Sequence, residues 1–226
     1  MAAVFGYLAL AFAASFLLGS IPWGVVVSRL AFHKDLRDEG SGNIGTTNAM
    51  RALGKAGGAA VFVLDFGKGL LSGWLGTLVA PSVLAAARVA GGEGPFPDAV
   101  ADDCAALVMA LVFAGCTLGH VFSPWLRFKG GKGIAVAAAC LVFVFGPVGF
   151  LAEIAVFAMG VLVTRHVSVG SIAAAVVCPV LALYYYWGHW LSWLVITLTA
   201  LVVVWAHRSN IRRLREGTES TIGRKK

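Results

Sequence analysis

The sequence predicts an all-α integral membrane protein with seven transmembrane helices, its N-terminus outside and its C-terminus in the cytoplasm. Of the 226 residues, 59% are hydrophobic and only 13% are charged, and the mean hydropathy is +0.84. An ordinary soluble domain has about 25% charged residues. Apolar runs close to the length that a membrane helix needs, about 20 residues, follow one another along the chain. The basic residues cluster in alternate connections between these runs, as they do in membrane proteins.

Seven apolar segments divide the chain. They are 4–30, 57–80, 104–122, 133–146, 148–164, 169–187 and 189–206. The stretch 134–164 is long for one span and short for two, and the sequence Gly-Pro-Val-Gly at 146–149 interrupts it. Apolar length alone is therefore compatible with six or seven spans.

Charge bias decides between the two counts. With seven spans, 16 of the 18 Lys and Arg residues fall on one side of the membrane. Six spans would move Arg165 and the basic tail to the other side. Because Lys and Arg favour the cytoplasmic side, we expect seven spans. No basic residue precedes the first apolar run, which favours a retained first span over a cleaved signal peptide.

The expected outer side has one long connection, about 81–103, which is acidic and contains Gly and Pro. We expect this loop to be flexible and to have no catalytic role. The whole chain, 1–226, is expected to form a single membrane-embedded domain with a cytoplasmic basic tail at 207–226. Its four cysteines are scattered through apolar runs without a C-x-x-C spacing, so we interpret them as small hydrophobic residues and expect no metal site.

Two short polar segments interrupt the apolar sequence. Residues 41–51 read SGNIGTTNAMR, and residues 129–133 read KGGKG. Glycines let neighbouring backbone N–H groups turn toward one point, and such a concavity binds anions. Lys and Arg supply the charge that holds a phosphate there. The sequence therefore predicts a membrane protein that handles phosphate groups at the bilayer surface.

Four polar segments are expected on the cytoplasmic side: 41–51, 120–133, 165–171 and 207–219. The positive-inside bias explains their Lys and Arg. It does not explain the small polar and imidazole side chains that accompany them, which are Ser41, Asn43, Asn48, His120, Ser168, His207 and Asn210. We therefore expect an anion site where these segments converge.

Three motif matches are discounted. Residues 40–45 fit G-x-G-x-x-G, but the dinucleotide fingerprint requires a preceding strand, and membrane helices flank it here. Gly131 and Lys132 lack the following Ser or Thr and the earlier Gly of a P-loop, so Mg-nucleotide binding is unsupported. Residues 33–38 fit the H-x-x-x-x-D pattern of one class of glycerolipid acyltransferases, but no companion motif accompanies the match.

Three charged residues lie well inside predicted spans, away from the cytoplasmic ends. Asp65 and Lys68 are three residues apart on one helical face. Ionisable groups at that depth are costly and are usually paired or functional. We interpret these two as an ion pair that ties helices together, with the alternative that Lys68 reaches the anion site from below. Glu153 is interpreted as a local packing or interfacial group near the outer end of its span.

Five segments carry a resemblance to a known family: 19–24, 41–51, 119–120 with 128–133, 165–171 and 207–219. Through these segments the chain resembles, along nearly its whole length, the bacterial acyl-phosphate–glycerol-3-phosphate acyltransferases, the PlsY family. The departures from the family pattern are Thr46, where Ala is usual, the altered stretch at 121–124, and the length of the 81–103 loop. They leave substrate preference open rather than reaction type.

The resemblance implies a reaction. A fatty acyl group passes from acyl phosphate to the 1-hydroxyl of sn-glycerol 3-phosphate, which gives 1-acyl-glycerol 3-phosphate (lysophosphatidate) and inorganic phosphate in phospholipid biosynthesis. It implies no cofactor, no metal and no nucleic acid. It also implies a multi-pass protein of the bacterial inner membrane with a cytoplasmic active site, and a functional link to a soluble enzyme that produces acyl phosphate.

The resemblance and the polar segments together give the expected site. The expected catalytic residues are Ser41, Arg51, Lys132, His207 and Asn210. The expected substrate-binding residues are Gly42, Asn43, Gly45, Thr46, Asn48, His120, Lys129, Gly130, Gly131, Gly133, Ser168, Arg213 and Glu219. Lys132, Lys129 and the glycine N–H groups of 130–133 would hold the acyl-phosphate headgroup. The hydroxyl proton would pass to His120, to His207 or to a phosphate oxygen of a substrate.

Two other functions fit part of the pattern. An organophosphate or phosphate transporter would place its site near the bilayer midplane, at broken helices of a repeated fold. Here the polar residues gather at one side, and no internal repeat is visible. A scaffold that binds anionic lipid would use the basic residues but would need no Ser, Asn and His beside the glycines.

Overall fold

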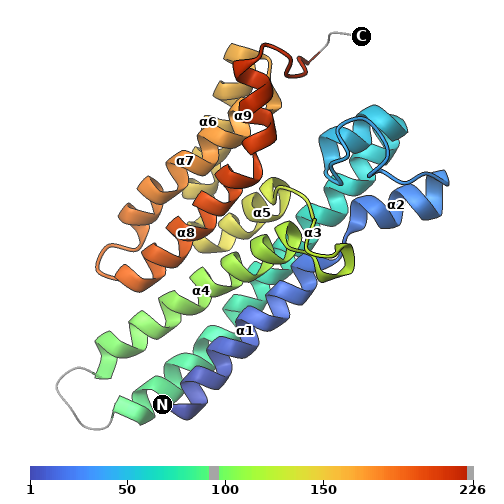
Figure 1. Cartoon of the computed structure of the whole chain (residues 1–226). Helices are drawn as coiled ribbons and strands as arrows, with labels where there is room; N and C mark the ends of the chain where they lie inside the picture. The colour runs from blue at the N-terminus through green and yellow to red at the C-terminus, as the bar shows by residue number, and fades with distance from the viewer. Residues whose placement is uncertain (92–96, 223–226) are drawn as a thin grey trace.

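The structure, a computed structural model, describes residues 1–91 and 97–222, and within these ranges its regular elements are all helical (Figure 1). A short 3₁₀ turn, Pro124–Leu126, lies between α4 and α5. The helices are α1 (Ala2–Ser20), α2 (Trp23–Phe32), α3 (Thr46–Gly91), α4 (Pro97–Val121), α5 (Ile134–Val144), α6 (Gly146–Thr164), α7 (Val167–Tyr185), α8 (Trp190–Ala206) and α9 (Arg208–Arg215).

The prediction of an all-α, multi-pass membrane protein is confirmed, but the count of seven spans is not. Each predicted apolar segment coincides with a helical stretch. By length and composition, 5 stretches of the described chain can cross a membrane, or 6 if the bent pair α8 and α9 counts as one span. Helix α5 has only 11 residues, which is roughly 16 Å of helix against a hydrocarbon core of about 30 Å. The seventh crossing and the orientation of the termini stay predictions.

The predicted outer loop at 81–103 is wrong for the residues that the structure describes. Helix α3 continues through Pro81 to Gly91, and α4 already begins at Pro97. The stretch between Pro81 and Gly91 is rich in Ala, the strongest helix former, and this propensity continues the helix beyond the apolar run. Residues 92–96 lie outside the described part of the chain.

The helices form two groups that meet along a central seam (Figure 1). Helices α1, α3 and α4 pack together, and α6, α7 and α8 form the second group. The short α5 contacts α3, α4 and α6, while α8 packs on α4. Close approach of α1 and α4 depends on small residues, since a Cβ at Gly115 or Gly119 would strike the backbone of α1.

Two helix breaks shape the end of the bundle that carries the polar segments. The chain turns at Ile21 and Pro22, between α1 and α2. Gly54, at φ 76° and ψ −174°, interrupts the long α3 near its start. Because the helix stops at Ser20, the carbonyl of Ile21 accepts no bond of a continued helix. It accepts the N–H of Trp23 at 3.1 Å and can also accept a hydrogen bond from a side chain of another helix.

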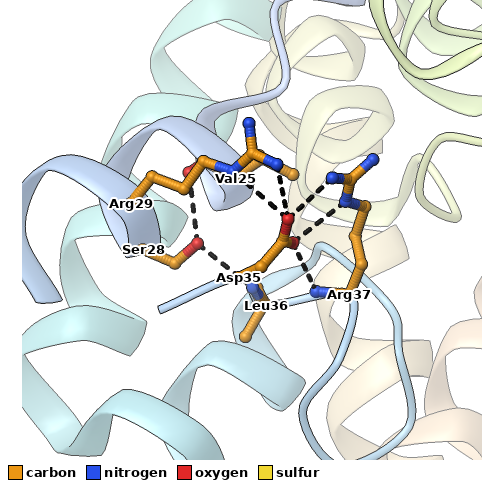
Figure 2. Close-up of polar contacts among 6 residues, drawn as sticks. All are labelled: Val25, Ser28, Arg29, Asp35, Leu36 and Arg37. Atoms are coloured by element: carbon orange, nitrogen blue, oxygen red, sulfur yellow. Dashed lines mark hydrogen bonds and ion pairs between the residues drawn. The ribbon is translucent and has the colours of Figure 1, made fainter. Parts of the chain in front are cut away.

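An arginine–aspartate cluster holds the loop that leads from α2 to the 41–51 segment (Figure 2). The Asp35 carboxylate accepts hydrogen bonds from Arg29 Nη2 at 2.7 Å, from Arg37 Nη2 at 2.6 Å and from the Arg37 backbone N–H at 3.0 Å. Ser28 Oγ accepts the next N–H of the loop, that of Leu36, at 3.2 Å. The bonds from Arg37, the largest cause, and from Arg29 hold the pKa of Asp35 well below its usual range. The loop therefore has a fixed path before it reaches Ser41.

Replacing Asp35 by Asn should loosen this loop with little effect on overall stability. The two Arg side chains are largely exposed, so the loss in free energy of unfolding should stay below about 1 kcal/mol. Limited proteolysis of the detergent-solubilised protein should show faster cleavage between α2 and α3. Asp38→Asn removes a charge from the same loop and keeps the Asp35 contacts, so it should retain the wild-type cleavage rate. Equal cleavage of both variants would contradict the proposed role of the cluster.

Candidate functional site

A cavity of about 460 Å³ lies between the two groups of helices. One end is polar and is formed by the segments that the sequence singled out. The other end lies among the helices and is mostly apolar, with Phe62, Phe66, Phe113, Leu141, Ile154 and Phe157 in its wall. The predicted site residues that line the cavity are Ser41, Asn43, Gly45, Thr46, Asn48, Arg51, His120, Lys132, Gly133, Ser168, His207, Asn210, Arg213 and Glu219.

A chain of polar contacts crosses the polar end. Lys132 Nζ donates a hydrogen bond to Asn210 Oδ1, and Asn210 Nδ2 donates to Glu219 Oε1 at 2.7 Å. Arg213 Nε donates to the other oxygen of Glu219, also at 2.7 Å. One carboxylate thus orients an amide and a guanidinium, and the amide in turn orients the ammonium of Lys132.

Burial and neighbouring charges change the acidity of two groups in this chain. The pKa of Lys132 falls to about 8, first because the side chain is buried and then because Arg213 and Arg51 lie nearby, although Glu219 acts in the opposite direction. Burial alone would raise the pKa of Glu219, but the hydrogen bonds from Asn210 and Arg213 outweigh it and hold that pKa below its usual value. The polar end therefore carries a surplus of positive charge that an anion would relieve.

The C-terminal segment after α9 is fastened across this end of the cavity. The N–H of Ile222 donates to the carbonyl of Arg165 at 2.9 Å, and His166 Nδ1 lies 3.1 Å from the carbonyl of Ser220. The positive φ of Arg165, 61°, turns the chain between α6 and α7 toward that segment. These contacts keep Glu219 over the cavity, beside Asn210.

The 41–51 segment brings a helix N-terminus to the cavity. Thr46 and Thr47, the first residues of α3, both line it, and a helix N-terminus favours anions. The Thr46 hydroxyl is buried and has no hydrogen-bond partner within the described residues. Arg51, one turn further along α3, also lines the cavity. This helix end was not anticipated from the sequence, because the predicted span began only at residue 57.

Asn43 and Asn48 hold the segment in shape. Asn43 Oδ1 accepts the N–H of Gly45 at 2.9 Å, which is an Asx-turn. Asn48 Oδ1 accepts the N–H of Ser41, while its Nδ2 donates to the carbonyls of Leu36 and Glu39. Asn48 therefore touches the cavity, but its amide is committed to the loop.

The buried ion pair of α3 extends into a three-way contact. Lys68 Nζ lies 2.8 Å from Asp65 Oδ1, 2.8 Å from the carbonyl of Ile21 and 2.9 Å from His120 Nδ1. The ammonium thus has one ion-pair partner, the Asp65 carboxylate, and two hydrogen-bond acceptors. The prediction that the pair ties helices together is confirmed, since it joins α3 to the break after α1 and to the end of α4. The contact between Lys68 and the His120 imidazole was not predicted.

His120 also contacts the glycine loop, residues 129–133, and so connects it to Lys68. Its carbonyl accepts the N–H of Gly131 at 3.0 Å, and the carbonyl of Val121 accepts that of Gly130 at 3.0 Å. A Cβ at Gly131 would overlap the imidazole of His120, and one at Gly130 would overlap the His120 carbonyl. The two glycines therefore let the loop lie against the end of α4, and this contact places Lys132 at the cavity.

Four predicted binding residues do not line the cavity: Gly42, Lys129, Gly130 and Gly131. The N–H groups of Gly130 and Gly131 are used by main-chain carbonyls, and that of Gly42 donates to Glu39. This corrects the expectation that the N–H groups of Gly130 and Gly131 are free to bind an anion. The Lys129 side chain is exposed to solvent. The glycine-rich sequence predicted a loop here, but it did not predict that the N–H groups of Gly130 and Gly131 point toward main-chain carbonyls and not into the cavity.

His207 sits at the bend between α8 and α9, where the two helices meet at 50°. Its Nδ1 lies 2.8 Å from the carbonyl of Val203. A carbonyl only accepts, so Nδ1 carries the hydrogen and Nε2 of the neutral ring is the free acceptor. At His120 the two ring nitrogens have the opposite roles. The Lys68 ammonium donates to Nδ1, so Nε2 carries the hydrogen of the neutral ring.

Glu153 lines the apolar part of the cavity and is only 4% exposed. This burial agrees with the predicted local packing role, whereas a place in the cavity wall was not predicted. The available signal was an ionisable residue in the middle of an apolar span, which is usually functional. Ser171 and Ser220 also line the cavity without having been predicted as binding residues.

The arrangement suits an amphipathic anion. Lys132, Arg51, Arg213 and the start of α3 offer positive charge and hydrogen-bond donors at one end of the cavity. The aromatic and aliphatic residues of α3, α5 and α6 offer a hydrocarbon surface at the other. A ligand with a phosphate head and an aliphatic tail would use both ends at once.

Comparison with known proteins gives one consistent answer. The family model described as "Glycerol-3-phosphate acyltransferase" matches residues 9–217. A glycerol-3-phosphate acyltransferase of Rhodopseudomonas palustris (strain BisB5) is 38% identical over 211 residues, which cover 93% of this chain and 94% of that protein.

Two solved structures are similar over the whole fold. A crystal structure of PlsY (YgiH), an integral membrane glycerol 3-phosphate acyltransferase, in its glycerol 3-phosphate form has a TM-score of 0.72 and 30% identity, with 96% of each chain covered. The lysophosphatidic acid form of PlsY has a TM-score of 0.69 and 28% identity, with 96% of this chain and 95% of that chain covered.

Replacing Lys68 by Met should destabilise the protein severely. The Asp65 carboxylate would stay buried without its counter-ion, which costs about 3–5 kcal/mol of unfolding free energy. Thermal unfolding in detergent should show a large fall in the midpoint. The double variant Asp65→Asn, Lys68→Met removes both charges and should recover most of the loss. A single variant as stable as wild type, or a double variant less stable than the single one, would contradict the ion-pair assignment.

Phosphate binding should weaken as the pH rises through about 8, because Lys132 then loses its charge. A phosphate monoester, whose second pKa is about 6, keeps its own charge constant in this range. Titration calorimetry should therefore show a dissociation constant that rises by up to about tenfold per pH unit above pH 8. The Lys132→Arg variant stays charged and should show a much flatter profile. Identical profiles for the two proteins would rule out Lys132 as the titrating group.

Proposed function

The chain belongs to the glycerol-3-phosphate acyltransferase family, and from this premise we propose that it transfers a fatty acyl group from acyl phosphate to the 1-hydroxyl of sn-glycerol 3-phosphate. The bond that forms joins the acyl carbon to the glycerol oxygen, and the bond that breaks joins the acyl carbon to the phosphate oxygen. The products are 1-acyl-glycerol 3-phosphate and inorganic phosphate. The observation that carries the proposal is that one cavity of the described chain has both a cationic end and an apolar interior.

The cationic end of the cavity would neutralise the negative charge that the two substrates bring together. Both substrates carry a phosphate, so they repel one another, and further negative charge develops on the acyl oxygen and on the leaving phosphate. Positive groups fixed before the reaction stabilise such charge most effectively. Lys132 and Arg51, with the Thr46 hydroxyl and the start of α3, would hold the acyl-phosphate head. Arg213, Asn210 and Ser168 would hold glycerol 3-phosphate.

Acyl phosphate is a mixed anhydride and is already activated. The reaction therefore needs no covalent intermediate on the enzyme, and the proposal includes no cofactor or metal. The contribution of the protein is to bring the hydroxyl to the acyl carbon in the right orientation, which can supply a large part of the rate increase. Ser41, which also lines the cavity, would donate a hydrogen bond to the acyl-phosphate group.

His207 is the better of the two histidines as acceptor of the hydroxyl proton. Its Nε2 is the free acceptor, because Nδ1–H is held by the Val203 carbonyl. The corresponding nitrogen of His120 carries hydrogen, and its other nitrogen is occupied by Lys68. A phosphate oxygen of a substrate is the remaining alternative. His120 would then serve to place the glycine loop.

Seven membrane crossings fit the path of the chain, although α5 is short. Gly133 lines the polar end of the cavity, α5 leads away from it, and α6 returns to Arg165, whose carbonyl meets the C-terminal segment. Helices α5 and α6 would then form an outward and a return crossing. By the charge bias of the loops, the cavity mouth and the C-terminus would face the cytoplasm, and the N-terminus would lie outside, in the bacterial inner membrane. Acyl phosphate would come from a soluble enzyme on the cytoplasmic side.

The direct test is turnover by the purified protein. Palmitoyl phosphate should release phosphate only when glycerol 3-phosphate is present, and lysophosphatidate should appear in equal amount by mass spectrometry. Palmitoyl-CoA, the control donor, should give no product. Uptake of labelled glycerol 3-phosphate into proteoliposomes without any acyl transfer would instead establish the transporter.

The His207→Asn variant tests the assignment of the base. Loss of a positioned general base lowers kcat by about 100- to 10,000-fold, whereas the KM for glycerol 3-phosphate should change little. Steady-state kinetics at saturating palmitoyl phosphate would measure both. A kcat within about threefold of wild type would exclude His207 and assign the proton to a substrate phosphate oxygen.

A further inference from the structure

A carboxyl group stands in the apolar wall of the cavity, away from the phosphate end. Glu153 of α6 lines the cavity and is 4% exposed. Its Oε1 is buried and has no hydrogen-bond partner among the described residues, and no ion pair to Glu153 is found in them. Neither the fold nor the proposed chemistry at the polar end uses this group.

The position of Glu153 along α6 gives its depth. Eleven residues separate it from Thr164, where α6 ends beside the C-terminal segment. At 1.5 Å per residue, the carboxyl-bearing turn lies roughly 16 Å from that end. On α7, Cys178 is the lining residue furthest from the helix start at Val167, also by eleven residues. Leu141 of α5 is the furthest lining residue of that helix. These three residues mark the deep end of the cavity.

Glu153 is a polar residue among apolar lining residues, so it changes the surface that a hydrocarbon chain would meet at this end of the cavity. The neighbouring lining residues on α6 are Ile154 and Phe157, and Leu141 and Cys178 face the same end. A hydrocarbon chain that stops short of Glu153 buries its methylenes against apolar side chains only. A longer chain must lie against the carboxyl and cannot offer it a hydrogen bond. The carboxyl is already largely buried and has no protein partner, so filling the cavity beside it with hydrocarbon removes the solvent access that remains to it, which is unfavourable.

We propose that Glu153 sets the longest acyl chain that the cavity accepts. This inference rests on the proposed function, because it assumes that the acyl chain of the donor lies in the apolar part of the cavity. The carboxyl then acts on the far end of the chain and not on the reacting carbonyl. Glu153 is a specificity-determining residue, and it should affect the ratio of rates for long and short donors.

The test compares three variants on a series of acyl phosphates: octanoyl, dodecanoyl, palmitoyl and stearoyl. Glu153→Leu replaces the carboxyl by a similar apolar side chain and should raise kcat/KM for the longest donor relative to the shortest by about tenfold or more. Glu153→Gln keeps an unpaired polar group and should retain the wild-type ratio. Met159→Leu changes an outward-facing, 62% exposed residue of the same helix and should also retain it. A folding defect would lower all rates together and leave the ratio unchanged.

Binding of unreactive alkyl phosphates of the same lengths, measured by thermal shift, gives the second readout. If wild type turns over no acyl phosphate, the proposed function fails, while a length limit in alkyl phosphate binding that Glu153→Leu removes would still support the role of Glu153. If turnover is normal but Glu153→Leu keeps the wild-type length profile in both assays, the inference is overturned and the proposed function stands.

Discussion

The buried ammonium of Lys68 is the contact on which the arrangement of the site depends. It meets the Asp65 carboxylate, the carbonyl of Ile21 at the break after α1 and the imidazole of His120, and so it joins three helices at one point. Removing only one partner of such an ion pair is costly, because the other charge stays buried without its counter-ion. Through the carbonyl and ring of His120, the same point supports the loop that carries Lys132. A charge inside the membrane-spanning part of α3 therefore fixes the position of a charge at the cavity.

The polar end is organised by a second carboxylate, that of Glu219. It aligns Asn210 and Arg213, and Asn210 accepts from Lys132, so cations from distant parts of the chain face one small volume. Like charges repel unless an anion lies between them, and Glu219 partly serves as that anion in the protein itself. A phosphate would find its binding groups already in place, which reduces the cost of ordering them. The apolar part of the same cavity accounts for the second half of an amphipathic substrate.

Much of this could be predicted from the sequence, because polar residues in an apolar chain are conspicuous. The segments 41–51, 129–133 and 207–219 were found by their glycines, cations and small polar side chains, and most of the residues named there do line one cavity. The directions of backbone groups could not be predicted: the N–H groups of Gly130 and Gly131 point to carbonyls of α4. The place of Glu153 in the cavity wall could not be predicted either, because a count along one span does not show which neighbouring helices close around a residue. The predicted loop at 81–103 is too long because its limits follow from the ends of the apolar runs, and the helices continue beyond these runs.

The central claim is that one cavity holds the phosphate head and the acyl tail of the donor together. An experimental structure with an unreactive long-chain alkyl phosphonate and glycerol 3-phosphate would test it most directly. The account predicts density for the phosphonate between Lys132 and Arg51, and a tail that runs between α5, α6 and α7 toward Glu153. A tail that leaves the polar end along the outer, lipid-facing surface of the helices, with the apolar part of the cavity unoccupied, would contradict it.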